Sequence, residues 1–69
     1  MRGWTLDVLR VVREIEKREF QLEDVYGFAA HLQKLHPANR HVLDKIRQQL
    51  QVLRDLGLVE FLGRGRYRT

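Results

Sequence analysis

The spacing of apolar and polar residues predicts three helices along most of the chain. Apolar side chains recur at intervals of three and four, which places them on one side of a helix, over residues 5–18, 23–35 and 40–56. The single Trp, Trp4, is expected to cover the first helix and the core. The expected core positions of the third helix are Leu43, Ile46, Leu50 and Leu53.

The boundaries of these segments carry residues that start or stop helices. Thr5 is expected to cap the first helix and Asn39 the third, because their side-chain oxygens accept hydrogen bonds from free N–H groups. Pro37 restricts the residue before it and ends the second helix, and Gly57 is placed to end the third. Two helices joined by the short turn at 37–39 form a helix-turn-helix pattern.

The C-terminal residues change to the pattern of a β-hairpin. Apolar residues that favour strands dominate 58–62, glycines flank Arg64 at the turn, and a second short run follows at 66–68. Residues 20–22 are expected to form a short extended link before the second helix. This order predicts a mainly α winged helix-turn-helix fold, with three helices and a wing, in one domain over residues 1–69. A flexible glycine- and arginine-rich tail is the alternative to the wing.

The composition excludes several classes of enzyme. The chain has no Cys and no Ser, so it holds no disulfide, no thiolate or seryl nucleophile and no cysteine zinc site. The His residues are five apart, which does not place two on one helical face as a metal pair requires. No Lys has an acidic residue two positions before it, as PD-(D/E)xK nucleases require. The sequence therefore predicts a binding domain with no catalytic residues, no metal and no cofactor.

Neither a membrane segment nor a secretion signal is expected. No apolar run approaches the ~18 residues of a membrane span, and the first residues lack the apolar core of a signal peptide. The expected location is the cytoplasm.

The charge is distributed unevenly along the chain. Lys and Arg number 13 and Asp and Glu number 9, which gives a net charge of +4. Residues 1–35 carry six basic and six acidic side chains, and residues 36–69 carry seven basic and three acidic ones. The whole net charge therefore lies in the second half, which indicates an anionic partner that contacts one face of the domain. Ten of the basic residues are Arg, whose planar fork fits phosphates and guanine edges.

The candidate contact residues lie on the third predicted helix and on the hairpin. The polar side of the helix at 40–56 is rich in Arg and Gln, which hydrogen-bond to guanine and adenine edges in the major groove. Strand alternation is expected to place the three arginines of the wing at 62–68 on one side and Tyr67 on the other, so that the arginines contact phosphates. The predicted DNA-binding residues are Asn39, Arg40, His41, Asp44, Lys45, Arg47, Gln48, Gln51, Arg64, Arg66 and Arg68.

Specific motifs connect the chain to a known family. The C-terminal winged-helix domain of Dam-replacing and DpnI-type methyl-directed restriction endonucleases is similar to residues 35–68, LHPANRHVLDKIRQQLQVLRDLGLVEFLGRGRYR, and to the preceding LEDVYGFAAHLQKLHP. The resemblance spans nearly the whole chain. It is most specific in the LHPxN, KIRQQLQ and FLGRGRYR segments.

This resemblance implies binding to double-stranded DNA at GATC sites whose adenines carry a methyl group on the exocyclic amine. The stretches that match the binding region are 39–51 and 63–68. The resemblance also implies a monomeric, non-catalytic module. It is either excised from a parent chain that carries a PD-(D/E)xK nuclease domain or part of a different fusion. The expected apolar contacts to the methyl groups come from Ala38, His41 and Val42.

Two other functions stay open at this point. A winged-helix transcription regulator usually dimerises, and the sequence supplies no long dimerisation helix. A winged helix that binds only protein is expected to show no salt-dependent binding to DNA.

Overall fold

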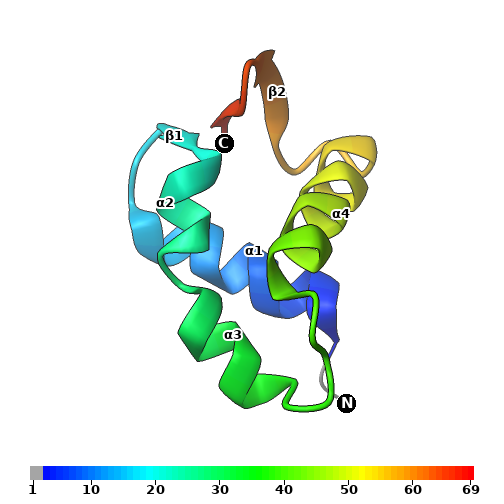
Figure 1. The fold of residues 1–69 in the computed structure, drawn as a ribbon. Coiled ribbons are helices and arrows are strands. Elements are labelled where there is room, and N and C mark those ends of the chain that lie inside the picture. Colours follow the sequence, from blue (N-terminus) through cyan, green and yellow to red (C-terminus); the bar gives the residue numbers. More distant parts are fainter. Residues whose placement is uncertain (1–2) are drawn as a thin grey trace.

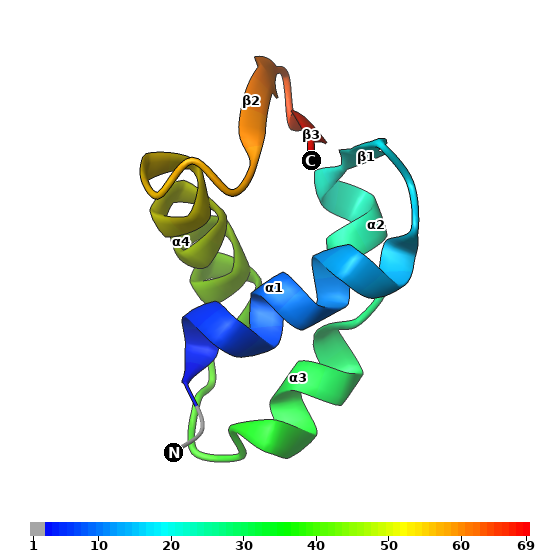
Figure 2. The same cartoon turned by 180° about the vertical axis from the view of Figure 1, so that it is seen from behind.

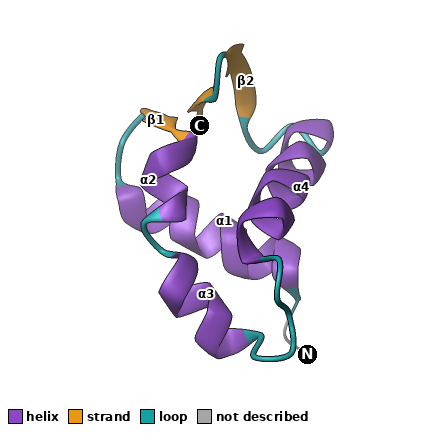
Figure 3. Cartoon of the chain, viewed as in Figure 1, coloured by secondary structure: helices purple, strands orange, loops and turns teal. Residues whose placement is uncertain are grey.

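A computed structural model describes residues 3–69, and its elements follow the order of a winged helix-turn-helix domain (Figure 1 and Figure 3). In chain order they are α1 (Trp4–Ile15), β1 (Glu19–Gln21), α2 (Leu22–Tyr26), α3 (Ala29–Leu35), α4 (Val42–Asp55), β2 (Glu60–Gly63) and β3 (Arg66–Arg68). β3 lies between β1 and β2, and both pairs are antiparallel, so the wing gains a third strand from the segment after α1. The predicted fold class is confirmed, with one more helix than expected among the described residues. The extended link expected at 20–22 is present as β1, one residue earlier.

The helices pack around a small apolar core next to the sheet. α1 crosses behind α2 and α4 in Figure 1 and in front of them in Figure 2, and it contacts both helices. Phe20 of β1 extends the core to the sheet, where its ring stacks on Tyr67 of β3 with the centroids 5.6 Å apart. The core residues are Val8, Val11, Val12, Phe20, Val25, Leu32, Val42, Ile46, Leu50, Leu53 and Val59.

The predicted helix at 23–35 is wrong in its extent, because the chain turns at Gly27 and separates α2 from α3. The N–H of Phe28 donates to the carbonyl of Val25 at 2.9 Å, which is the bond of a tighter turn than an α-helix. A Cβ on Gly27 would lie 3.3 Å from the carbonyl oxygen of Asp24, so glycine permits this close turn. The break lets α3 take a different direction from α2 (Figure 1).

The first helix begins one residue earlier than the sequence indicates and ends at Ile15. α1 starts at Trp4 after extended backbone at Gly3, so Thr5 lies inside the helix and does not cap it. The Thr5 hydroxyl instead donates to the side-chain oxygen of Gln49 in α4. This contact satisfies Gln49, which is buried on the side of α4 that faces α1.

The third predicted helix, 40–56, is shorter at both ends in the structure. α4 starts at Val42, and the Asn39 side chain accepts a hydrogen bond from the N–H of His41 at 2.8 Å. Asn39 therefore shapes the turn before α4 and is not its cap. Gly57 adopts a φ of +80° just after the helix, so the predicted stop at this residue is confirmed.

Gly57→Ala is expected to lower the free energy of unfolding by about 1–2 kcal/mol, because a Cβ is disfavoured in left-handed backbone. No heavy atom beyond the chain neighbours lies within 4 Å of the position of that Cβ, so backbone strain is the only cost. Urea unfolding measures the loss. Gly57→Asn is the matched control and should lose less, since Asn tolerates this conformation. Equal losses in the two variants would contradict the strain argument.

A buried hydrogen bond between side chains fixes the turn that precedes α4. Asp7 of α1 is 4% exposed, and its carboxylate lies 2.7 Å from Nε2 of His36, the residue after α3. The His36 ring stacks on Trp4 with the centroids 4.1 Å apart, which agrees with the predicted covering role of Trp4. We call Trp4, Asp7 and His36 the His36 clamp. The clamp holds the α3–α4 turn against the first turns of α1 and thereby positions the start of α4.

Candidate nucleic-acid interface

α4 presents a polar side to solvent. Asp44, Arg47, Gln48 and Gln51 are exposed and share one side of the helix, because they lie three or four residues apart. The opposite side is buried in the core. The middle of α4 therefore carries an accessible surface of guanidinium and amide groups, which are the groups that hydrogen-bond to base edges.

A groove of about 380 Å³ lies between this side of α4 and the hairpin. The hairpin wall consists of the rings of Phe61 on β2 and Tyr67 on β3, whose centroids are 5.4 Å apart. The guanidinium of Arg54 on α4 lies 5.4 Å from the centroid of Phe61. The residues that line the groove are Asp44, Arg47, Gln48, Gln51, Arg54, Phe61 and Tyr67.

Tyr67 offers a phenol to the groove. Burial raises the pKa of Tyr67 above its ordinary value of 10.0, and the nearby charges of Arg47 and Arg54 only partly oppose this. The phenol is therefore protonated at neutral pH and able to donate a hydrogen bond. None of the side-chain hydrogen bonds within residues 3–69 involves Tyr67, so this donor is unused inside the domain.

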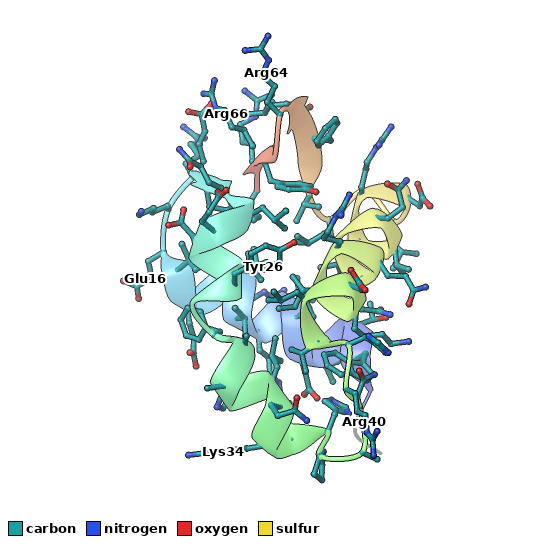
Figure 4. All side chains as sticks on the ribbon, viewed as in Figure 1. Glu16, Tyr26, Lys34, Arg40, Arg64 and Arg66 are labelled. Carbon is teal, nitrogen blue, oxygen red and sulfur yellow. The ribbon has the colours of Figure 1, made fainter. Side chains whose placement is uncertain are left out.

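Strand alternation predicts all three hairpin arginines on one side of the wing, and this prediction is wrong for Arg64. Arg66 and Arg68 share one face of β3, opposite Tyr67, and alternation holds there. Arg64 lies in the turn with a φ of +49°, where alternation does not apply, and its side chain extends from the tip of the wing (Figure 4). Because Tyr67 lines the groove, Arg66 and Arg68 lie on the other, outer face of the sheet and do not line it. Arg68 lines a neighbouring pocket with Arg54 near the end of α4.

The two outer-face arginines are paired with carboxylates. Arg66 lies 3.8 Å from a carboxylate oxygen of Glu19, and Arg68 bonds to Glu60. All four side chains are about half exposed, and such pairs contribute only ~0–1 kcal/mol to stability. Arg64 belongs to no ion pair among the described residues. Arg64, at the tip of the wing, is therefore the most available positive charge of the three hairpin arginines.

The predicted contacts before α4 lie at the other end of the molecule from the wing tip. Figure 4 shows Arg40 and Arg64 at these two ends, with α4 between them. The candidate surface is thus elongated and runs from the α3–α4 turn along α4 to the hairpin. Ala38, Arg40 and His41 are exposed, whereas Asn39 and Lys45 are half-buried.

Two apolar positions on α4 differ from the prediction. Val42, an expected methyl contact, is 8% exposed and lies in the core, so it does not offer that contact. Leu43, an expected core residue, is instead 47% exposed, one turn before Arg47. The cause is that the Gln49 side of α4 packs toward α1, which turns Leu43 away from the core.

Three groove residues are not among the predicted contacts. Arg54 follows Arg47 by seven residues, which is two helical turns, so helical spacing alone could have identified it. Phe61 and Tyr67 are directly paired across β2 and β3. Their pairing depends on the register shift between Phe61 and Gly63, which no pattern of residue types specifies.

Within the described part of the chain, no three of the His, Asp and Glu side chains are grouped closely enough to hold a metal ion. None of the helices among residues 3–69 combines the length and the apolar composition of a bilayer-spanning segment.

A comparison with protein families agrees with this architecture. A family model described as a Dam-replacing HTH domain matches residues 1–69, which is the whole chain. The match includes the α3–α4 turn, α4 and the hairpin. All parts of the candidate interface therefore belong to the matched domain.

Proposed function

The chain belongs to the Dam-replacing HTH domain family, and on this premise we propose that it recognises duplex DNA in which the adenines of GATC are methylated. A helix-turn-helix DNA-binding domain is not itself catalytic. In this proposal the chain is a monomeric module of a cytoplasmic restriction endonuclease, and a separate PD-(D/E)xK domain of the parent protein cuts the DNA.

The observation that carries the proposal is the polar side of α4. Arg47, Gln48 and Gln51 are exposed on one side of a 14-residue helix whose other side is buried. A helix ~10–12 Å wide fits a major groove ~12 Å wide. Arg donates two hydrogen bonds to guanine, and Gln pairs with the adenine edge. A GATC duplex presents both bases on each strand.

Leu43, Ala38 and His41 are the proposed contacts to the methyl groups. All three are exposed at the start of α4 or in the turn before it, and Leu43 takes the role that the burial of Val42 excludes. In fully methylated GATC the two modified amines lie on adjacent base pairs in the major groove, so one helix reaches both. Burying one methyl group is worth ~0.8 kcal/mol, so two methyl groups favour binding by roughly 15-fold.

The hairpin is the proposed phosphate contact. Arg64 extends from the tip and has no ion-pair partner among residues 3–69. Arg66 and Arg68 can exchange Glu19 and Glu60 for phosphates, because exposed ion pairs are weak. Such contacts predict affinity for duplex DNA that falls steeply as salt rises.

Leu43→Ala is expected to reduce the preference for methylated over unmethylated GATC duplexes by about fourfold, because an apolar contact worth ~0.8 kcal/mol is lost. Leu56→Ala is the matched control, since Leu56 is 63% exposed just beyond the far end of α4. Fluorescence anisotropy with both duplexes at one salt concentration measures the preference. A preference that Leu43→Ala leaves unchanged would remove Leu43 from the methyl contact.

A further inference from the structure

The groove between α4 and the hairpin is lined by two arginines, one in the middle of α4 and one near its end. Arg47 and Arg54 form no ion pair within 4.0 Å among residues 3–69, unlike Arg66 and Arg68 on the outer face of the sheet. Asp44 is the acidic residue that lines the groove. It precedes Arg54 by ten residues, or ~15 Å along the helix. The Arg54 end of the groove therefore favours an anion.

The hydrogen-bond donors at the Arg54 end are oriented by neighbouring aromatic rings and form no side-chain hydrogen bonds among the described residues. The Arg54 guanidinium lies over the ring of Phe61, and this cation–π contact orients the planar group while leaving its N–H donors free. The Phe61 ring in turn contacts Tyr67, whose protonated phenol has no partner among the side-chain hydrogen bonds of the described residues. Arg54 and Tyr67 therefore offer hydrogen bonds to one ligand in the groove.

We propose that this groove binds one backbone phosphodiester of the DNA strand, which the Arg54 guanidinium and the Tyr67 phenol hold while Phe61 packs against the adjacent deoxyribose. The inference rests on the proposed function, because duplex DNA is the ligand. The Arg fork matches the two non-bridging oxygens of a phosphate, and the phenol adds a third donor. The groove volume of about 380 Å³ lies in the range of ~300–1,000 Å³ that small-molecule sites occupy.

A phosphate in this position separates backbone contacts from base contacts. With α4 in the major groove, the strand that borders that groove passes between α4 and the hairpin. Arg47 lies two turns nearer the start of α4 and stays free for a base edge. Arg54 and Tyr67 then fix the depth and register at which α4 enters the major groove, which is the role of phosphate contacts.

Duplexes in which single phosphates around GATC are replaced by uncharged methylphosphonates locate this site. The wild-type chain should lose about tenfold in affinity when the groove phosphate is neutralised. Arg54→Ala should bind the unmodified duplex about tenfold more weakly, and the same methylphosphonate should then reduce its affinity no further.

Tyr67→Phe keeps the ring contacts and loses only the phenol hydroxyl, so its loss of affinity should be confined to the same phosphate. Arg10→Ala, which removes an exposed arginine of α1 outside the candidate interface, is the matched control and should keep the wild-type response at this position.

If neutralising each phosphate in turn reduces the affinity of Arg54→Ala by the same factor as that of the wild-type chain, the phosphate site is overturned. Running the scan on methylated and unmethylated duplexes separates this inference from the proposed function. If the chain prefers methylated duplexes but Arg54→Ala responds to every methylphosphonate as the wild-type chain does, only the phosphate site is overturned. If Arg54→Ala is insensitive at one phosphate but the chain shows no methyl preference, only methyl recognition is overturned. Failure of the wild-type chain to bind any duplex would overturn both.

Discussion

Replacing His36 with alanine is expected to lower the free energy of unfolding by about 2–4 kcal/mol. His36 is the partner of the Asp7 carboxylate, which is 4% exposed and lies 2.7 Å from Nε2 of the imidazole. Without His36 this carboxylate stays buried and loses its side-chain hydrogen-bond partner. The stacking of His36 on Trp4, worth about 0.5–1.5 kcal/mol, is lost as well. Such a loss is a large share of the stability of a 69-residue domain, and thermal and urea unfolding both measure it.

Asp7→Ala is the matched variant because it removes the same hydrogen bond from the other side. It leaves no buried carboxylate without a partner, and it leaves the His36 ring stacked on Trp4, so the expected loss is smaller, about 1–3 kcal/mol. His36→Gln retains an amide donor and should lose less than His36→Ala. If Asp7→Ala unfolds as easily as His36→Ala, the unpaired carboxylate is not the cause of the destabilisation.

Arg47→Ala is expected to weaken binding to GATC duplexes by about 1–3 kcal/mol and to reduce the preference for GATC over other sequences. The reason is that Arg47 is exposed in the middle of the polar side of α4, where a guanidinium reaches a guanine edge. Gln48→Ala should also reduce the preference for GATC over other sequences. Titrations with a GATC duplex and a duplex of permuted sequence measure both the affinity and the preference.

Arg64→Ala is the matched comparison because Arg64 is an exposed arginine at the wing tip with no ion pair among residues 3–69. This change should weaken binding to all duplexes by a similar factor and make the log–log salt slope shallower by ~0.9. Identical behaviour of Arg47→Ala and Arg64→Ala would contradict the division between a base-contacting helix and a phosphate-contacting wing.

The sequence predicts α1, α4 and the wing because their signals are local. Apolar residues at helical spacing mark both helices, and Gly57 stops α4 through its own backbone freedom. The break between α2 and α3 is different. Helical spacing continues from Val25 through Leu32, and the turn depends on how closely the position of Gly27 approaches the carbonyl of Asp24. That distance is a property of the folded backbone and not of the apolar pattern.

The chemistry of the candidate site could be predicted better than its geometry. The Arg and Gln side of α4 follows from helical spacing. The exposure of Leu43 and the burial of Val42 do not, because they depend on where α1 crosses α4, a contact between residues as far apart as Thr5 and Gln49. The separate position of Arg64 depends on its left-handed conformation in the turn.

Binding to GATC duplexes that differ only in adenine methylation tests the central claim most directly. Three duplexes with no methyl group, one and two are titrated at a single salt concentration, and a duplex with methylated adenines outside GATC is the control. Each methyl group should raise the affinity by about fourfold, so the doubly methylated duplex should bind at least about 15-fold more tightly than the unmethylated one. Equal affinity for all three GATC duplexes would contradict methyl recognition by this domain.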